Sequence, residues 1–199
     1  AAWLLRFAAR CNRRDYLEAG RAKGRMLNAS RLLLADLVED ARVACDFNPG
    51  GMVYVYRDGR AWEHVAAVVE EARGFGIESE TWSSERLAAE EPALLPGMAG
   101  GLYFPGDASL RPDQLVAGLA RAVREAGGVI DERCRVTGFA REAGRLSHVQ
   151  TERGRRAARE VVLASGAWST PMARQLGLRI PVQPGKGYSI TYSRPSLAP

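Results

Sequence analysis

The first fifth of the chain has the apolar periodicity of helices. Between residues 22 and 42 apolar side chains recur at helical spacing, which predicts an amphipathic helix. Residues 3–17 follow the same pattern and predict a preceding helix whose arginines are Arg6, Arg10, Arg13 and Arg14. A basic helix of this kind is able to lie on a membrane surface. More commonly its apolar stripe packs on a core, and this is the interpretation that we favour.

Turn signals divide the next part of the chain into short strands and helices. The segment 48–51 (Asn-Pro-Gly-Gly) predicts a turn, and the β-forming run 52–56 after it predicts a strand. Helical spacing predicts a helix from Val65 to about Gly74. Ser83 has the side chain of a helix N-cap. The other elements expected here are strands at 80–82 and 100–105 and a short helix after Ser83.

The pattern changes after Pro105. Pro112 suits the first turn of a helix, where its missing N–H needs no partner, and Gly127-Gly128 ends that helix. Its expected buried face consists of Leu115, Leu119, Val123 and Ala126. A strand is predicted to start at Val129-Ile130. Three further strands, with turns at Gly144 and Gly154 between them, are predicted at 133–140, 146–151 and 157–163.

Composition excludes several classes of function. The net charge is +5 and the pI about 9.4, but the 28 basic residues are spread along the chain, whereas a nucleic-acid groove gathers them with exposed aromatics. We therefore expect no nucleic-acid partner. Cys11, Cys45 and Cys134 lie far apart, as do His64 and His148, so no metal site is predicted. The odd number of cysteines favours a reducing compartment.

The chain lacks the usual motifs of catalysis and of nucleotide binding. No nucleophile and base occur together, and Asp107 and Asp113 suit a turn and a helix N-terminus better than an acid–base pair. Gly185-Lys186-Gly187 does not continue into G-x-G-x-x-G, because Ile190 occupies the last position. We therefore name no catalytic residue.

One segment does have a composition that suits a ligand. The run Val161–Ala164 is apolar throughout, which is typical of a strand buried in a parallel sheet. It leads into Ser165-Gly166-Ala167, whose small side chains would let the backbone approach a flat ligand. Ligands of open α/β sheets gather at the carboxyl ends of strands. A tight turn needed only for packing explains the same residues equally well.

The segment 161–169 resembles the V-V-x-A-x-G-x-W-S motif that passes beside FAD in the D-amino-acid oxidase superfamily. The order of the surrounding features is similar as well, and Pro184–Gly187 matches the P-x-[RK]-G element of that family. Lys23–Met26 and Glu90–Leu94 resemble segments of its bacterial D-amino-acid dehydrogenases. Together the matching features extend over essentially the whole chain, so the ordered set is far more specific than any one motif.

The resemblance implies a mixed α+β / α/β fold. A substrate domain with a mixed sheet and helices would begin at residues 1–105, part of a Rossmann-like FAD domain with a β-meander would follow at 106–176, and residues 177–199 would return to the substrate domain. Val136 would lie against the adenine side of FAD. The other residues implied to line the cofactor are Ala164, Ser165, Gly166 and Trp168.

The resemblance also implies an activity, which is FAD-dependent oxidative deamination of D-amino acids to 2-oxo acids and ammonia. A glycine, sarcosine or hydroxyproline oxidoreductase acting on a secondary amine stays open, as does a non-catalytic basic binding module. Oxygen, a quinone or another electron acceptor is compatible with the family. The implied location is the cytoplasm, with peripheral association at the inner membrane as an alternative.

Two further expectations follow from the same comparison. The dinucleotide motif and the carboxyl-terminal flavin region of the family are missing, so we expect an internal fragment that is inactive on its own. Tyr54 and Tyr56 share one face of their strand and are candidates for substrate binding. Lys186, which would re-enter the substrate domain beside the flavin, is the third candidate.

Overall fold

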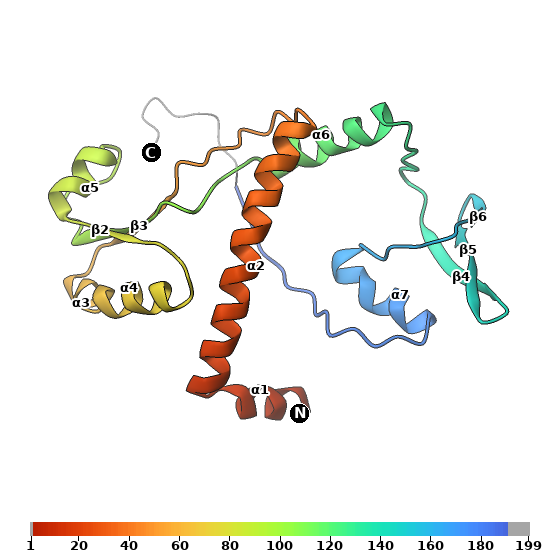
Figure 1. Ribbon diagram of the computed structural model, residues 1–199, viewed down its shortest axis with the longest axis horizontal. Coiled ribbons are helices and arrows are strands. Elements are labelled where there is room, and N and C mark those ends of the chain that lie inside the picture. The colour runs from red at the N-terminus through yellow and green to blue at the C-terminus, as the bar shows by residue number, and fades with distance from the viewer. Residues whose placement is uncertain (1, 191–199) are drawn as a thin grey trace. The chain divides into compact units, whose positions relative to one another are not determined.

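The computed structural model describes residues 2–190, with side chains from Leu4 onward. These residues form two compact units, one ending at Gly128 and the other beginning at Val129. Both units mix helices and strands (Figure 1), so the predicted mixed fold class is confirmed. The predicted domain boundaries at residues 105 and 176 stay predictions, and the last part of the third predicted segment lies outside the described residues.

The first unit opens with two helices, as predicted, but the break between them comes after residue 10 and not between residues 17 and 22. Helix α1 spans Ala2–Arg10 and α2 spans Arg13–Asp40. Between them Asn12 has an extended backbone, and its side chain accepts a hydrogen bond from the N–H of Asp15 at 3.0 Å, which caps α2. The predicted continuous helix over residues 3–17 is therefore wrong at this point. The apolar stripe of α1 was also expected to pack on a core. In the structure α1 leaves large apolar side chains exposed, namely Leu4, Leu5 and Phe7.

A three-stranded antiparallel sheet forms the centre of this unit. Strands β1 (Met52–Tyr56) and β2 (Glu80–Trp82) pair on either side of β3 (Gly100–Phe104). All three match the prediction. Leu102 in the central strand is 1% exposed, and it faces Tyr54 across the β1–β3 pair. Adjacent residues of β3 point to opposite faces of the sheet.

Short helices cover both faces of this sheet. On one face are α3 (Gly59–Glu63) and α4 (Val65–Gly74), and on the other is α5 (Ser84–Glu90), as Figure 1 shows. Glycines on β3 permit this close approach, because a β-carbon at Gly100 would clash with the ring of Trp62 in α3 and one at Gly101 would lie only 3.1 Å from the side chain of Leu87 in α5. Leu87 of α5, only 1% exposed, packs over Gly101. The predicted N-cap is confirmed, since Ser83 accepts a hydrogen bond from the N–H of Arg86.

Helix α2 docks on the carboxyl end of α4. The ring of Phe75 lies against Gly20, and the Phe75 carbonyl lies against Gly24. Tyr16 packs edge-on against Phe75, with ring centroids 5.8 Å apart. The side chain of Asn28 donates a hydrogen bond to the carbonyl of Gly76 at 3.2 Å. Two glycines one turn apart thus form the groove that receives Phe75.

Helix α6 (Pro112–Glu125) completes the first unit. Its buried residue is Gly118, which lies against the side chain of Val43. The expected burial of Val123 and Ala126 is wrong, because both are exposed in the structure. The spacing of apolar residues in α6 does correspond to an apolar stripe. Within the described residues, however, little packs on the carboxyl-terminal half of that stripe.

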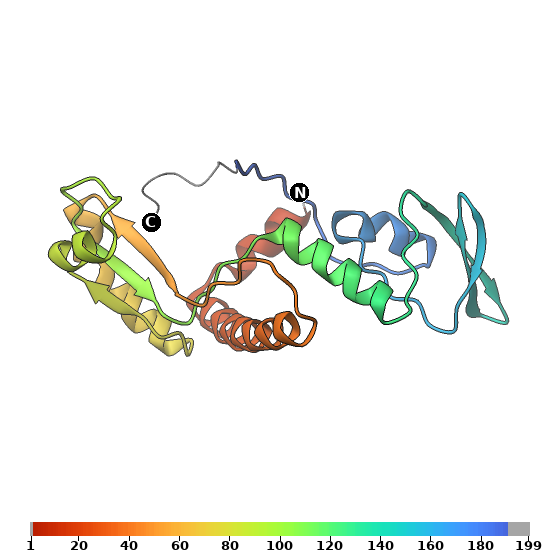
Figure 2. The same cartoon turned by 90° about the horizontal axis from the view of Figure 1, so that it is seen from above.

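The second unit is built around an antiparallel meander of β4 (Val136–Glu142), β5 (Arg145–Thr151) and β6 (Gly154–Ala157), drawn in cyan and light blue in Figure 2. The predicted hairpin turn at Gly144 is confirmed, with Ala143 and Gly144 both at positive φ, as a two-residue hairpin turn requires. The short 3₁₀ helix η1 (Gly166–Trp168) and α7 (Ser169–Gln175) follow the meander.

Two predicted strands of the second unit are wrong. Val129-Ile130 has no regular structure, and the strand expected at 157–163 is replaced by β6, which ends at Ala157. The segment Val161–Ala164 pairs with no strand among the described residues, and Val162 is 87% exposed. β-Propensity reflects how well a side chain fits a pleated, packed surface, so an apolar run without a neighbouring strand does not form one.

Candidate functional site

The first candidate site is the small-residue turn that leads into α7. Residues 161–165 have no regular secondary structure, and Gly166 has φ +53°. A β-carbon placed on Gly166 would meet no atom within 4 Å, so the space beside the turn is open. The hydroxyl of Ser165 lies 3.2 Å from that of Ser169, which holds the turn to the first residue of α7. The turn therefore has the open, side-chain-free surface that the sequence predicts.

Apolar groups flank this turn and face solvent. Val162 and Trp168 are 87% and 72% exposed, a large exposure for side chains of their kind. Behind the turn, the guanidinium of Arg141 on β4 donates a 2.6 Å hydrogen bond to the carbonyl of Leu176, which ties the end of α7 to the meander. Val136 lies on the same strand, opposite Thr151. A rigid support with an uncovered apolar face suits a flat, largely apolar ligand.

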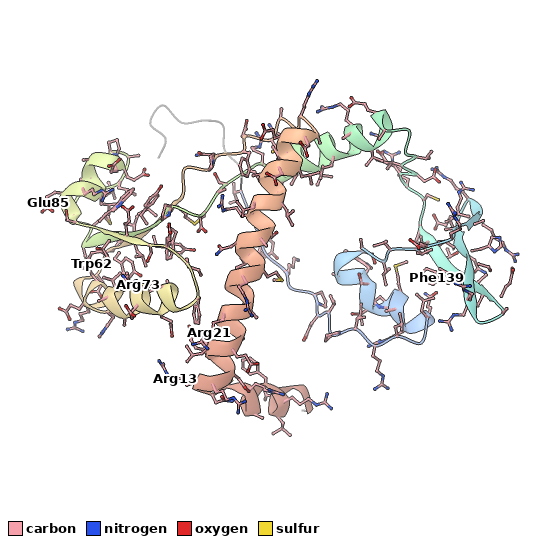
Figure 3. All side chains as sticks on the ribbon, in the orientation of Figure 1. Arg13, Arg21, Trp62, Arg73, Glu85 and Phe139 are labelled. Atoms are coloured by element: carbon pink, nitrogen blue, oxygen red, sulfur yellow. The ribbon has the colours of Figure 1, made fainter. Side chains whose placement is uncertain are left out.

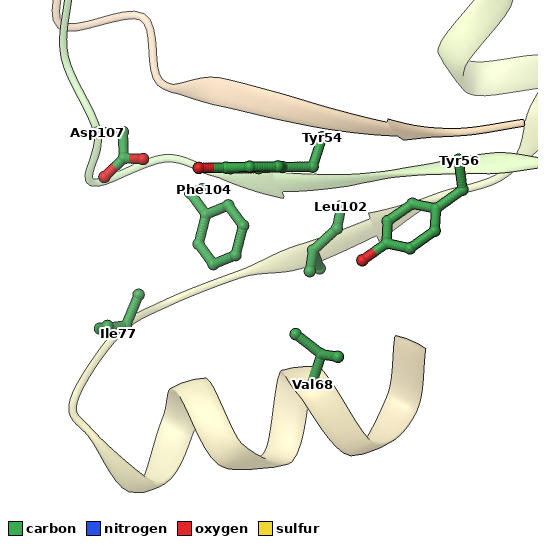
Figure 4. Close-up of a pocket in the computed structure, with 7 residues that line it drawn as sticks. All are labelled: Tyr54, Tyr56, Val68, Ile77, Leu102, Phe104 and Asp107. Carbon is green, nitrogen blue, oxygen red and sulfur yellow. The ribbon is translucent and has the colours of Figure 1, made fainter. Parts of the chain in front are cut away.

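The second candidate site is a pocket in the first unit, which we call the tyrosine pocket. It has a volume of about 310 Å³, and its lining residues are Tyr54, Tyr56, Val68, Ile77, Leu102, Phe104 and Asp107. The sheet supplies one wall, and Val68 of α4 and Ile77 face it from below in Figure 4. The antiparallel register explains this wall, because Tyr54 and Leu102 are directly paired and share a face.

Polar groups of the tyrosine pocket have no partner within residues 2–190. The hydroxyls of Tyr54 and Tyr56 and the carboxylate of Asp107 make no hydrogen bond or ion pair there. The aromatic rings, in contrast, are fixed: Tyr54 packs edge-on against Phe104 with centroids 5.5 Å apart, and Tyr56 lies 5.5 Å from Trp62. The pocket thus combines rigid apolar walls with a few polar atoms that are free to bind a ligand.

Sequence reasoning found two of these seven residues. Tyr54 and Tyr56 were expected on one face, and the structure places them there together. Lys186, the third candidate, belongs to the second unit, where its ammonium group lies 5.2 Å from the centre of the Tyr188 ring. Asp107 was expected only as a turn residue. Asp107 reaches the pocket because of the path that the backbone takes after β3, and the sequence does not indicate that path.

The electrostatics of the surface are dominated by exposed ion pairs. Arg111 pairs with Asp113 at 2.7 Å, and this hydrogen bond lowers the pKa of Asp113. Arg153 and Arg156 share the carboxylate of Asp131. Arg73 on α4, labelled in Figure 3, pairs with Glu70 at 2.8 Å. In the part of the chain that the structure describes, no three His, Cys, Asp or Glu side chains meet in a metal-binding group. No helix of residues 2–190 is long and apolar enough to cross a membrane.

Comparison with known proteins identifies the family. Residues 3–199 match the model of the DAO family, described as FAD-dependent oxidoreductase. The chain belongs to this family. The family is FAD dependent, and the predicted resemblance of the chain to the D-amino-acid oxidase superfamily is thereby confirmed. The exposed small-residue turn fits such a cofactor, since no side chain occupies the space beside Gly166.

Two individual members of the family are similar to this chain in sequence. The chain is 34% identical over 194 residues to a D-amino acid dehydrogenase of Paramagnetospirillum magneticum, an alignment that covers 96% of this chain and 46% of that protein. It is 44% identical over 102 residues to a glycine oxidase of Pseudomonas putida, covering 51% of this chain and 28% of that protein. The chain thus spans about half the length of the dehydrogenases that it matches.

A solved structure supports the same family. The crystal structure of glycine oxidase from Geobacillus kaustophilus superimposes with a TM-score of 0.67 and 27% identity, over 75% of this chain and 41% of that one. Of these three proteins, the D-amino acid dehydrogenase is similar in sequence over nearly the whole chain, and the glycine oxidase of Geobacillus kaustophilus is similar in structure over three quarters of it.

Proposed function

We propose that the protein that carries this chain is an FAD-dependent dehydrogenase that oxidatively deaminates D-amino acids to 2-oxo acids and ammonia. The observation that supports this most is the identity to a D-amino acid dehydrogenase along 96% of the chain. A second such dehydrogenase, from Methylobacterium, is 35% identical over 95% of the chain. Because the chain spans 46% of each of these proteins, residues outside it would contribute to the activity, and we expect the chain alone to be inactive.

FAD would be held at the turn that precedes α7. Ala164, Ser165 and Gly166 would let the backbone approach the cofactor, and the exposed indole of Trp168 would pack nearby. Val136 would contribute its backbone on the adenine side. When bound, the flavin supplies an acceptor for the hydride that leaves the substrate carbon. The protein residues orient that carbon and exclude water, and the substrate carboxylate needs a cationic partner.

Substrate contacts are proposed for Tyr54 and Tyr56, and for Lys186 where the chain returns toward the substrate domain. The two tyrosine hydroxyls have no partner in the described part of the chain, which leaves them available to a ligand. Lys186 is a candidate for the substrate carboxylate because an ammonium group attracts it. The ammonium group of Lys186 also lies over the ring of Tyr188. This packing would compete with binding of the substrate carboxylate.

Glycine, sarcosine or hydroxyproline oxidation is the second candidate, and the 44% identity to a glycine oxidase over 102 residues favours it. A panel of substrates separates the two. The purified flavoprotein is mixed anaerobically with D-alanine, D-phenylalanine, glycine or sarcosine, and bleaching of the flavin absorbance is followed. Bleaching by the D-amino acids alone supports the first proposal, and bleaching by glycine or sarcosine alone replaces it with the second.

The electron acceptor and the location are parts of the same proposal. A quinone acceptor would place the enzyme beside the inner membrane, and the exposed Leu4, Leu5 and Phe7 of α1 with the nearby arginines suit peripheral association. Reduction of a soluble quinone analogue, compared with oxygen consumption, tests the acceptor. Co-sedimentation with anionic vesicles tests the association, and a protein that stays in the supernatant at low salt would contradict peripheral binding to the membrane.

A further inference from the structure

The tyrosine pocket has features that a simple gap in the core would lack. Tyr54 is 53% exposed, so the pocket opens to solvent. Its floor, formed by Leu102, is fully buried, and its volume of about 310 Å³ lies at the lower end of the range for small-molecule sites. Empty cavities inside proteins are small, closed and apolar. The tyrosine pocket, in contrast, is open and has unpaired polar groups at its walls.

The chemistry of the lining selects one class of ligand. Val68, Ile77, Leu102 and Phe104 present an apolar surface, which favours an aliphatic or aromatic group. Asp107 is the only charged residue of the lining, and its carboxylate has no cationic partner within the described residues. A ligand with an ammonium group would supply that partner, whereas a ligand with an acidic side chain would be repelled.

We propose that the tyrosine pocket receives the apolar side chain of an amino-acid substrate, with the ammonium group of that substrate beside Asp107. This inference rests on the proposed function, and it narrows the substrates to amino acids with aliphatic or aromatic side chains. Glycine would leave the pocket empty. D-glutamate would place its side-chain carboxylate in the apolar pocket, close to the carboxylate of Asp107. The pocket therefore also favours the D-amino-acid reaction over glycine oxidation.

Direct binding tests the pocket without any use of the flavin. Saturation-transfer NMR with D-phenylalanine detects which ligand protons contact the protein. We expect the strongest signals on the ring, and an affinity about 10- to 100-fold higher for D-phenylalanine than for D-alanine, from the additional apolar surface that is buried. Equal signals along the whole D-phenylalanine molecule, or no preference over D-alanine, would overturn the inference.

Two matched pairs of variants locate the binding. Val68→Trp fills the pocket from α4 and should abolish the preference for D-phenylalanine. Ala67→Trp adds the same side chain to the neighbouring residue of the helix, which is exposed and outside the pocket lining, so the preference should persist. Asp107→Asn removes the charge at constant size and should weaken D-phenylalanine binding about tenfold. Asp36→Asn on the exposed side of α2 controls for the loss of net charge.

Two results distinguish an error in the assignment of the pocket from an error in the proposed function. If D-amino acids bleach the flavin but Val68→Trp retains the wild-type ratio of kcat/KM for D-phenylalanine over D-alanine, the pocket is not the side-chain site and the proposed function stands. If no flavin is bound at all, the proposed function fails, and the NMR signals still decide whether the pocket binds an apolar amino acid.

Discussion

Replacement of Gly24 by alanine is expected to destabilise the first unit, although alanine is the better helix former. Gly24 lies in the interior of α2 and is buried against the end of α4. A β-carbon added there would meet the backbone oxygen of Phe75 at 2.5 Å. Backbone atoms cannot rotate away as a side chain does, so α2 would have to shift. The hydrogen bond from Asn28 to Gly76, 3.2 Å long, would be lost with that shift.

The magnitude follows from three opposing contributions. Alanine in place of glycine favours the helix by about 1 kcal/mol. Overpacking of a well-packed contact costs about 1–3 kcal/mol, and loss of the Asn28 hydrogen bond adds about 1 kcal/mol. The net expectation is a decrease of about 1–3 kcal/mol in the free energy of unfolding. For a chain of this length the decrease corresponds to a Tm lower by about 2–12 °C.

Thermal unfolding followed by circular dichroism measures this change, and two further glycines serve as controls. Gly20 faces the ring of Phe75, which is able to rotate, so Gly20→Ala should cost less than Gly24→Ala. Gly74 ends α4, and a β-carbon there would meet nothing within 4 Å, so Gly74→Ala should be neutral or slightly stabilising. A Gly24→Ala variant as stable as the wild type would show that α2 does not dock on Phe75 in this way.

Three shorter predictions concern packing, charge and the cofactor. Leu87→Ala should lower the free energy of unfolding by about 2–5 kcal/mol, measured by urea denaturation, whereas Leu33→Ala on the exposed side of α2 should change it by less than about 0.5 kcal/mol; equal effects would contradict the burial of Leu87. The hydrogen bond from Arg111 lowers the pKa of Asp113, so its stabilisation is present above the unfolded-state pKa and is lost as the pH falls through the folded-state value. The stability difference between the wild type and Asp113→Asn should therefore shrink on acidification, and a difference that grows would refute the assignment. Val162→Asp should weaken FAD retention without lowering the Tm of the apoprotein, because Val162 is 87% exposed; unchanged flavin content would argue against a cofactor at this turn.

Elements that depend on local chemistry were predictable from the sequence. The cap at Ser83, the proline at the start of α6 and the turn at Gly144 each specify a boundary through one or two residues. Strands β1 to β5 appear where β-forming runs lie. Asn12 is the exception. It is the N-cap of α2, but the helical pattern of apolar residues continues through it and does not indicate a break there.

Features that depend on a distant partner were not predictable. Val161–Ala164 has the composition of a buried strand, but pairing requires a neighbour, and among residues 2–190 it has none. Val123 likewise belongs to an apolar stripe that little covers. In the tyrosine pocket, Asp107 joins Tyr54 only through the pairing of β1 with β3. Sequence periodicity identifies which face of an element is apolar, but it does not identify what packs on that face.

The central claim is that this chain belongs to a flavoenzyme that oxidises D-amino acids, and anaerobic reduction of the bound flavin tests it most directly. The protein that carries the chain is purified, its visible spectrum is recorded, and D-alanine or D-phenylalanine is added without oxygen. We predict a flavin spectrum that is bleached by these substrates and restored by an electron acceptor. A protein that stays colourless after incubation with FAD would contradict the account, and strong, salt-dependent binding to anionic polymers would then favour a basic binding module.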